Sequence, residues 1–92
     1  MRLDMFLKSS RLVPRRSLAQ EFCDARLIEV NGLTAKPSKE IGPGDKITIR
    51  RRSRITTVEV AALPAGKQVA KNAVAELYRM ISDETLSVDP LA

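Results

Sequence analysis

The spacing of apolar residues changes along this chain of 92 residues, and that change limits the fold more than any other feature. Up to about residue 25, apolar residues recur every three or four positions, which is the period of an amphipathic helix. From Leu27 to Val60 they alternate with polar residues, as in a strand that has one buried face. Helices followed by strands in one small chain predict an α+β domain.

The helical part predicts two short helices. In the first, from about Asp4 to Ser9, apolar residues share one face, and Asp4 can act as an N-cap acceptor. The second follows Pro14, because proline suits the first helical turn, and Ser17 and Gln20 have the spacing of a capping box. Three of its residues are expected to face inward, with Cys23 beside them: Leu18, Phe22 and Ala25.

Turn signals divide the alternating part into strands. Asn31-Gly32 lies between Ile28-Glu29-Val30 and Leu33, a pattern typical of a tight two-residue hairpin. Residues 46–50 and 55–60 predict two further strands, with Ile47 and Ile49 pointing inward.

After Pro64, near-helical spacing from Val69 to Ile81 predicts a closing amphipathic helix over about Gln68–Ser82. The sequence therefore predicts a single domain over residues 1–82, with its core motif at about 1–50. Residues 83–92 are expected to form a flexible tail.

Positive charge is concentrated in residues 1–56, which hold 13 Lys and Arg against 6 Asp and Glu, whereas residues 57–92 hold 3 against 5. Such a basic half is typical of proteins that bind nucleic acids or anionic membranes, and charge alone does not choose between them. Five cations lie in the first 16 residues: Arg2, Lys8, Arg11, Arg15 and Arg16. Two of them, Arg15 and Arg16, lie near a predicted helix start, where the dipole favours a negative ligand such as phosphate. The alternative is a solvated charged face.

A second cluster consists of Arg50, Arg51, Arg52 and Arg54, at a strand end and turn. Arginine forks pair well with phosphate oxygens, which makes these side chains auxiliary candidates for RNA binding. The alternative is an exposed turn whose charge keeps the protein soluble. Lys36 and Lys39, after the predicted hairpin, extend the basic face or are ordinary loop lysines.

Catalytic and metal-binding residues are scarce in the sequence. The chain has no histidine and one cysteine, which excludes the usual zinc sites and nucleophile–histidine pairs within one chain. Cys23 is expected to be a small buried hydrophobe, and a lone cysteine fits a reducing compartment. No apolar stretch has the length of a membrane span. We therefore expect a cytoplasmic protein that is not an enzyme, uses no cofactor or metal, and binds no membrane.

The motifs Arg2-Leu3-Asp4, Phe6-Leu7-Lys8, Ser10-Arg11-Leu12, Arg15-Arg16-Ser17, Val30-Asn31-Gly32, Ala35-Lys36 and Pro43-Gly44-Asp45 occur here in this order. Together they resemble the S-four domain, the RNA-binding domain named after ribosomal small-subunit protein four. The resemblance covers about residues 1–50. Because the domain stands alone, the chain is similar to the RqcP family of ribosome-associated quality-control factors and to the heat-shock S-four proteins.

The resemblance implies an α+β fold in which the two N-terminal helices pack on a small, mainly antiparallel sheet, an αL-type RNA-binding motif. It implies binding to rRNA of the large ribosomal subunit and to tRNA, where such proteins hold peptidyl-tRNA on stalled subunits together with other quality-control factors. The RNA contacts that it implies are Arg2, Lys8, Arg11, Arg15 and Arg16, with Lys36 as a weaker candidate. Asp4 would be a helix cap or an orienting partner for an arginine.

The sequence departs from the family at Arg26, where relatives usually have the glycine that ends the second helix. Arg26 would have to adopt a left-handed backbone, and it could add an RNA contact. We expect a monomer. The alternatives are an RNA- or DNA-binding module with another target, and a protein-interaction adaptor whose basic face meets an acidic partner.

Overall fold

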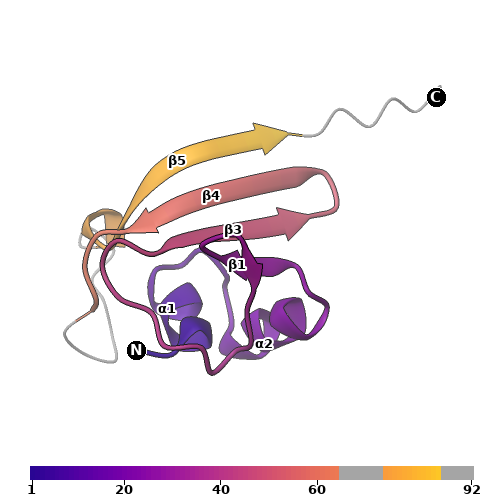
Figure 1. Ribbon diagram of the computed structural model, residues 1–92, viewed down its shortest axis with the longest axis horizontal. Coiled ribbons are helices and arrows are strands. Elements are labelled where there is room, and N and C mark those ends of the chain that lie inside the picture. The colour runs from indigo at the N-terminus through magenta and orange to yellow at the C-terminus, as the bar shows by residue number, and fades with distance from the viewer. Residues whose placement is uncertain (65–73, 86–92) are drawn as a thin grey trace.

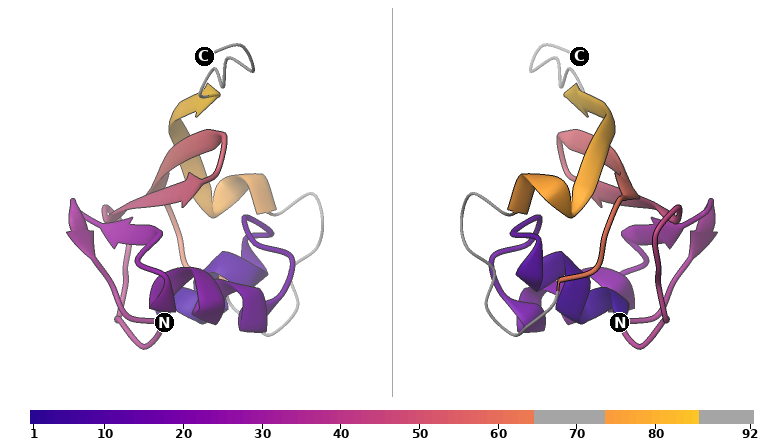
Figure 2. Two further views of the ribbon diagram at one scale, coloured as in Figure 1. Left: turned by 90° about the vertical axis from the view of Figure 1, so that its right-hand side faces the viewer. Right: turned by 90° about the vertical axis from the view of Figure 1, so that its left-hand side faces the viewer.

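The computed structural model of the protein describes residues 1–64 and 74–85. Two helices, α1 (Leu3–Ser9) and α2 (Arg16–Asp24), lie on one side of a five-stranded antiparallel sheet (Figures 1 and 2). The strands are β1 (Ile28–Val30), β2 (Leu33–Thr34), β3 (Lys46–Arg51), β4 (Arg54–Val60) and β5 (Tyr78–Thr85). Their order in the sheet is β2-β1-β3-β4-β5, so β2 and β5 are its edges. The predicted pair of helices on an antiparallel sheet is confirmed.

The core is aliphatic and lies where the helices meet the sheet. Its fully buried side chains come from both layers: Leu3, Phe6, Leu7, Val13, Ile28, Ile47, Ile49 and Val58. Ile47 and Ile49 point inward, as predicted, because β3 alternates between a buried and an exposed face. Ile47 pairs with Val30 on one side and Val58 on the other, which carries the core across three strands.

The predicted hairpin at Asn31-Gly32 is confirmed. Both residues have positive φ, 53° and 86°, as the preferred two-residue hairpin turn requires. The Asn31 side chain also ties the hairpin to the next strand: its Oδ1 accepts from the Lys46 N–H at 3.0 Å and its Nδ2 donates to Asp45 at 3.1 Å. Asn31 therefore fixes both the turn and the start of β3.

Replacing Asn31 with alanine should lower the free energy of unfolding by about 1–2 kcal/mol, because alanine loses two hydrogen bonds and tolerates positive φ poorly. Urea unfolding of the variant would measure this. Leu33→Ala is a matched control, since Leu33 adjoins the turn and its side chain is 74% exposed. An equal loss in both variants would contradict the role assigned to Asn31.

The predicted C-terminal helix is wrong over its second half, and residues 68–73 lie outside the described residues. A short 3₁₀ helix, η1 (Val74–Glu76), is followed by β5, which pairs with β4. Thr57 pairs with Ser82 and Val58 with Met80, so a β-bulge leaves Ile81 between them. The bulge breaks the period of two, which is why the apolar spacing resembled a helix. β5 runs to Thr85, three residues into the predicted tail, and residues 86–92 are outside the described part.

Both N-terminal helices differ from the prediction at their first turns. Their N-caps are Arg2 and Arg15, and neither makes a side-chain cap hydrogen bond. Asp4 is buried instead, and the Gln20 side chain donates to Asp4, so the predicted cap and capping box do not form.

The inward face of α2 is shifted by one position from the prediction: Ala19 and Cys23 are buried, Leu18 and Phe22 are half-buried, and Ala25 is exposed.

Candidate nucleic-acid interface

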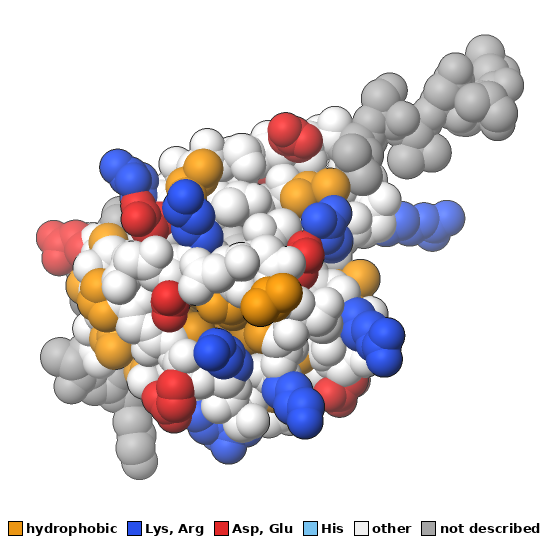
Figure 3. All heavy atoms as spheres, in the orientation of Figure 1, with side chains coloured by type: hydrophobic (Ala, Val, Ile, Leu, Met, Phe, Trp, Pro, Cys, Tyr) orange, Lys and Arg blue, Asp and Glu red, His pale blue; other side chains and the backbone are white. Residues whose placement is uncertain are grey.

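Five cations surround the two helices, and we call them the basic helical face: Arg2, Lys8, Arg11, Arg15 and Arg16. Arg2 and Arg15 precede α1 and α2, Arg16 opens α2, and Lys8 lies in the last turn of α1. All five are exposed. Figure 3 shows one side of the molecule, with Lys and Arg side chains spread over both its upper and lower parts and Asp and Glu among them. The predicted cations are thus all available to a ligand.

Asp4 lies beneath the basic helical face and orients two of its arginines. Its side chain is fully buried, and its Oδ2 accepts hydrogen bonds from Arg2 Nη2 at 3.2 Å, Arg16 Nε at 3.1 Å and Gln20 Nε2 at 3.0 Å. Its Oδ1 accepts from the Met5 N–H at 2.8 Å. One carboxylate therefore holds two arginines, from the starts of two helices, on one surface. Of the two roles that the sequence suggested for Asp4, orienting partner is confirmed.

The bonds to Asp4 keep it ionised. Burial would raise the pKa of Asp4, but the hydrogen bonds from Gln20, Arg16 and the Met5 N–H, together with the positive charge of Arg16, outweigh it and hold the pKa below its ordinary value of 3.8. The side chains of Arg2 and Arg16 remain 44% and 43% exposed. Each keeps donors that face solvent.

The other three cations of the face are free of protein partners: among residues 1–64 and 74–85, none ion-pairs with Lys8, Arg11 or Arg15. Arg11 has a left-handed backbone, φ 62°, just past the end of α1, which costs an L-residue roughly 1–2 kcal/mol. Its N–H donates to the Lys8 carbonyl at 3.0 Å, closing the helix. Arg11 therefore projects from a fixed helix end.

The arginine cluster of the β3–β4 hairpin has partners inside the protein. Arg50 pairs with Glu29 at 2.9 Å, and Arg54 pairs with Asp83 through two hydrogen bonds. Arg51 Nη2 donates to the Leu12 carbonyl at 2.8 Å, which links β3 to the connection between the helices. Sequence reasoning missed the Arg51 contact, because a backbone acceptor 39 residues away leaves no pattern. Arg52, exposed in the turn, has no ion-pair partner among the described residues.

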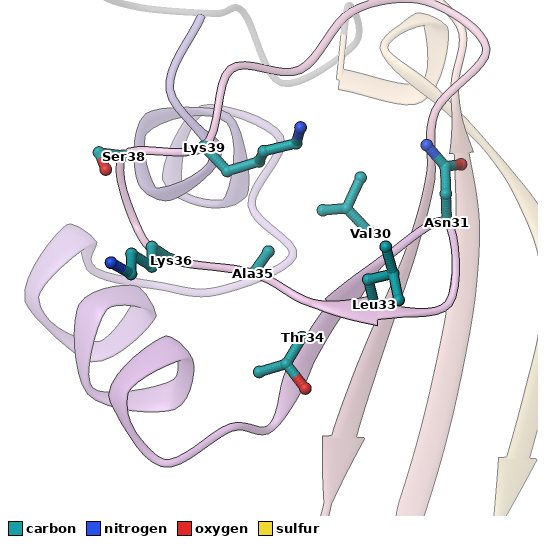
Figure 4. Close-up of a pocket in the computed structure, with 8 residues that line it drawn as sticks. All are labelled: Val30, Asn31, Leu33, Thr34, Ala35, Lys36, Ser38 and Lys39. Carbon is teal, nitrogen blue, oxygen red and sulfur yellow. The ribbon is translucent and has the colours of Figure 1, made fainter.

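Lys36 is exposed and follows β2. It borders two depressions, one of about 410 Å³ beside Val30 and Lys39 and one of about 390 Å³ beside Arg26. Figure 4 shows the first of these, with Thr34 and Lys36 on the part of the loop nearest α2. Lys36 thus shares a depression with the C-terminal end of α2, while its loop is bonded to the start of α1, where the Asp4 N–H donates to the Pro37 carbonyl at 3.1 Å.

Cys23 is buried on the inward face of α2, as predicted, and burial raises the pKa of its thiol to about 11, so it stays protonated. In the described ranges, no three potential metal-ligating side chains gather at one place. None of the helices in those ranges is long and apolar enough to cross a membrane.

Comparison with known proteins identifies the family. The model of the S4 domain family matches residues 1–47, which is half of the chain. The chain belongs to the S4 domain family. It is 42% identical to the RQC P-site tRNA stabilizing factor of Bacillus subtilis, over 94% of this chain and 98% of that protein. It is 39% identical to the factor of the same name from Listeria monocytogenes, over 91% and 89% of the two chains.

The fold also matches a solved structure. Heat shock protein 15 of Vibrio cholerae, described as trimeric, superposes with a TM-score of 0.76 at 30% identity, covering 89% of this chain and 82% of that one. The S4 resemblance, expected from the motifs of residues 1–50, is therefore confirmed, and the structural similarity covers 89% of the chain.

Proposed function

We propose that this protein is an RNA-binding factor of ribosome-associated quality control that binds rRNA and tRNA on the large ribosomal subunit and stabilises peptidyl-tRNA there. The observation that carries the proposal is the similarity to the Bacillus subtilis RQC P-site tRNA stabilizing factor, at 42% identity over almost the full length of both chains. A match of this extent leaves little of either protein to supply a different activity.

The basic helical face would make the RNA contacts. Lys8, Arg11 and Arg15 are exposed and without ion-pair partners in the described part of the chain, so binding a phosphate costs them no protein contact. Arg2 and Arg16 are oriented by Asp4, which reduces the side-chain entropy that binding would otherwise remove. Binding would thus be stoichiometric, with no bond made or broken, and the protein would not act as an enzyme.

The remaining assignments follow from this role. The protein would act in the cytoplasm, bind free large subunits that carry peptidyl-tRNA, and cooperate with other quality-control factors. We propose a monomer as the acting form. Lys36 and Arg52 would be peripheral contacts, while Arg50, Arg51 and Arg54 would mainly hold the fold.

If the five cations of the basic helical face each neutralise one phosphate, affinity should depend strongly on salt. The logarithm of the association constant for purified large subunits should fall with log salt at a slope of about −3.5 to −4.5, at roughly 0.7–0.9 per contact. Filter binding across a salt series measures this slope. A flat response would contradict electrostatic binding by this surface.

Sedimentation of cell extracts tests the ribosomal role itself. The protein should migrate with free large subunits rather than with intact ribosomes, and removing peptidyl-tRNA from those subunits should reduce the bound fraction. Binding to unrelated RNA or DNA with equal affinity would favour a module with another target. Binding only to acidic proteins would favour an adaptor.

A further inference from the structure

Arg26 lies just past the C-cap of α2 and has a left-handed backbone, with φ 62°. The Arg26 N–H donates to the Cys23 carbonyl at 3.0 Å and the Leu27 N–H to the Phe22 carbonyl at 2.9 Å. This pair of bonds is the Schellman motif, whose left-handed residue is usually glycine because a side chain there is strained. The chain ends α2 with a residue that the local geometry disfavours.

Contacts of the Arg26 side chain within the described protein do not offset the energetic cost of its left-handed backbone. It is exposed, and it makes no hydrogen bond or ion pair with any residue in the two described ranges. A cation near the end of a helix gains from the helix dipole, but the typical gain is smaller than the penalty for an L-residue in this conformation. Strain without compensating contacts points to a ligand.

A place for that ligand lies beside Arg26. A depression of about 390 Å³ separates the end of α2 from the loop after β2, with Arg26 on one wall and Lys36 and Thr34 on the other. Two cations and a hydroxyl donor face one space that is large enough for a phosphate group. Asp24 also lines the depression and offsets part of the positive charge, but it is exposed and forms no ion pair with either cation, so both keep their donors for a ligand.

We propose that Arg26 and Lys36 form a phosphate-binding subsite at the C-terminal end of α2, in addition to the five cations of the basic helical face, for the backbone of the same RNA. This inference rests on the proposed function. α2 has nine residues, which places Arg26 about 15 Å along the helix axis from Arg16. Phosphates follow one strand of duplex DNA at a rise of about 3.4 Å each, and at a similar spacing in RNA a segment of a few nucleotides spans both ends of α2.

The deciding experiment is the replacement of Arg26 by glycine in the full chain. Because glycine relieves the strain, the midpoint of thermal unfolding should stay the same or rise, while affinity for purified large ribosomal subunits should fall about three- to tenfold. The salt slope should become shallower by about 0.7–0.9. Lys36→Gln, which has no left-handed backbone to relieve, should weaken binding by a similar factor without raising the midpoint.

Arg79→Gln is the charge control, because it removes one positive charge from β5, at the opposite edge of the sheet, where Arg79 pairs with Glu59. It should leave affinity unchanged, and a fall equal to that of Arg26→Gly would overturn the subsite in favour of a bulk charge effect. If the wild-type chain binds large subunits and Arg26→Gly binds them equally well, the subsite is refuted and the proposed function stands. If the wild-type chain does not bind, both are refuted.

Discussion

Replacing Asp4 with alanine should lower the free energy of unfolding by about 3 kcal/mol, because it removes a fully buried carboxylate that accepts four hydrogen bonds. Two of these bonds come from guanidiniums, which are worth more than neutral donors. Asp4→Asn keeps an acceptor oxygen but loses the charge, and it should cost about 1–2 kcal/mol. Urea unfolding at neutral pH measures both.

The pH dependence separates the charge of Asp4 from its packing. Because the pKa of Asp4 is lowered in the folded protein, the carboxylate adds stability above its unfolded value of 3.8, and this stability is lost as pH falls through the folded pKa. The stability difference between wild type and Asp4→Asn should therefore shrink below about pH 4. Asp45 and Asp83, whose pKa values are also lowered, are present in both proteins, so their effects cancel.

Asp24→Asn is the control for this series. Asp24 lies on α2 but is exposed, and its replacement should change stability by less than about 0.5 kcal/mol. The role assigned to Asp4 would be wrong if its two variants behaved like this control. It would also be wrong if the difference between wild type and Asp4→Asn stayed constant into acid.

The features that sequence reasoning found are those set by neighbouring residues. The turn at Asn31-Gly32 depends on two residues that tolerate positive φ, and the inward direction of Ile47 and Ile49 follows from alternation along one strand. Such signals can be read without knowing what the segment packs against.

The features that it missed depend on partners distant in sequence. β5 forms because β4 offers it an edge, and the bulge at Ile81 conceals the strand period within Tyr78–Thr85. Asp4 could have capped its own helix, and its burial is decided by Arg16 and Gln20, which lie 12 and 16 residues further on. The fold class was therefore predictable, while the last strand and the hydrogen bonds beneath the basic helical face were not.

Replacing both Lys8 and Arg15 with glutamine should weaken binding to large ribosomal subunits by about 10- to 100-fold at physiological salt and reduce the salt slope by about 1.4–1.8. Neither residue ion-pairs with a described residue, so the fold should keep its stability to within about 0.5 kcal/mol. Filter binding across a salt series, with urea unfolding alongside, would separate lost contacts from lost structure.

The matched control is the double variant Lys46→Gln and Arg79→Gln. Both pairs of substitutions change the net charge from +5 to +3, since each removes two positive charges. Lys46 lies on β3 and Arg79 on β5, and both pair in the sheet with Glu59 of β4. They are therefore not on the helices that carry the basic helical face. Equal losses of affinity in the two double variants would mean that net charge alone drives binding. A loss of affinity in the Lys8 and Arg15 variant alone would place the RNA on the basic helical face. There, phosphates of the RNA would pair with two cations that have no ion-pair partner among the described residues.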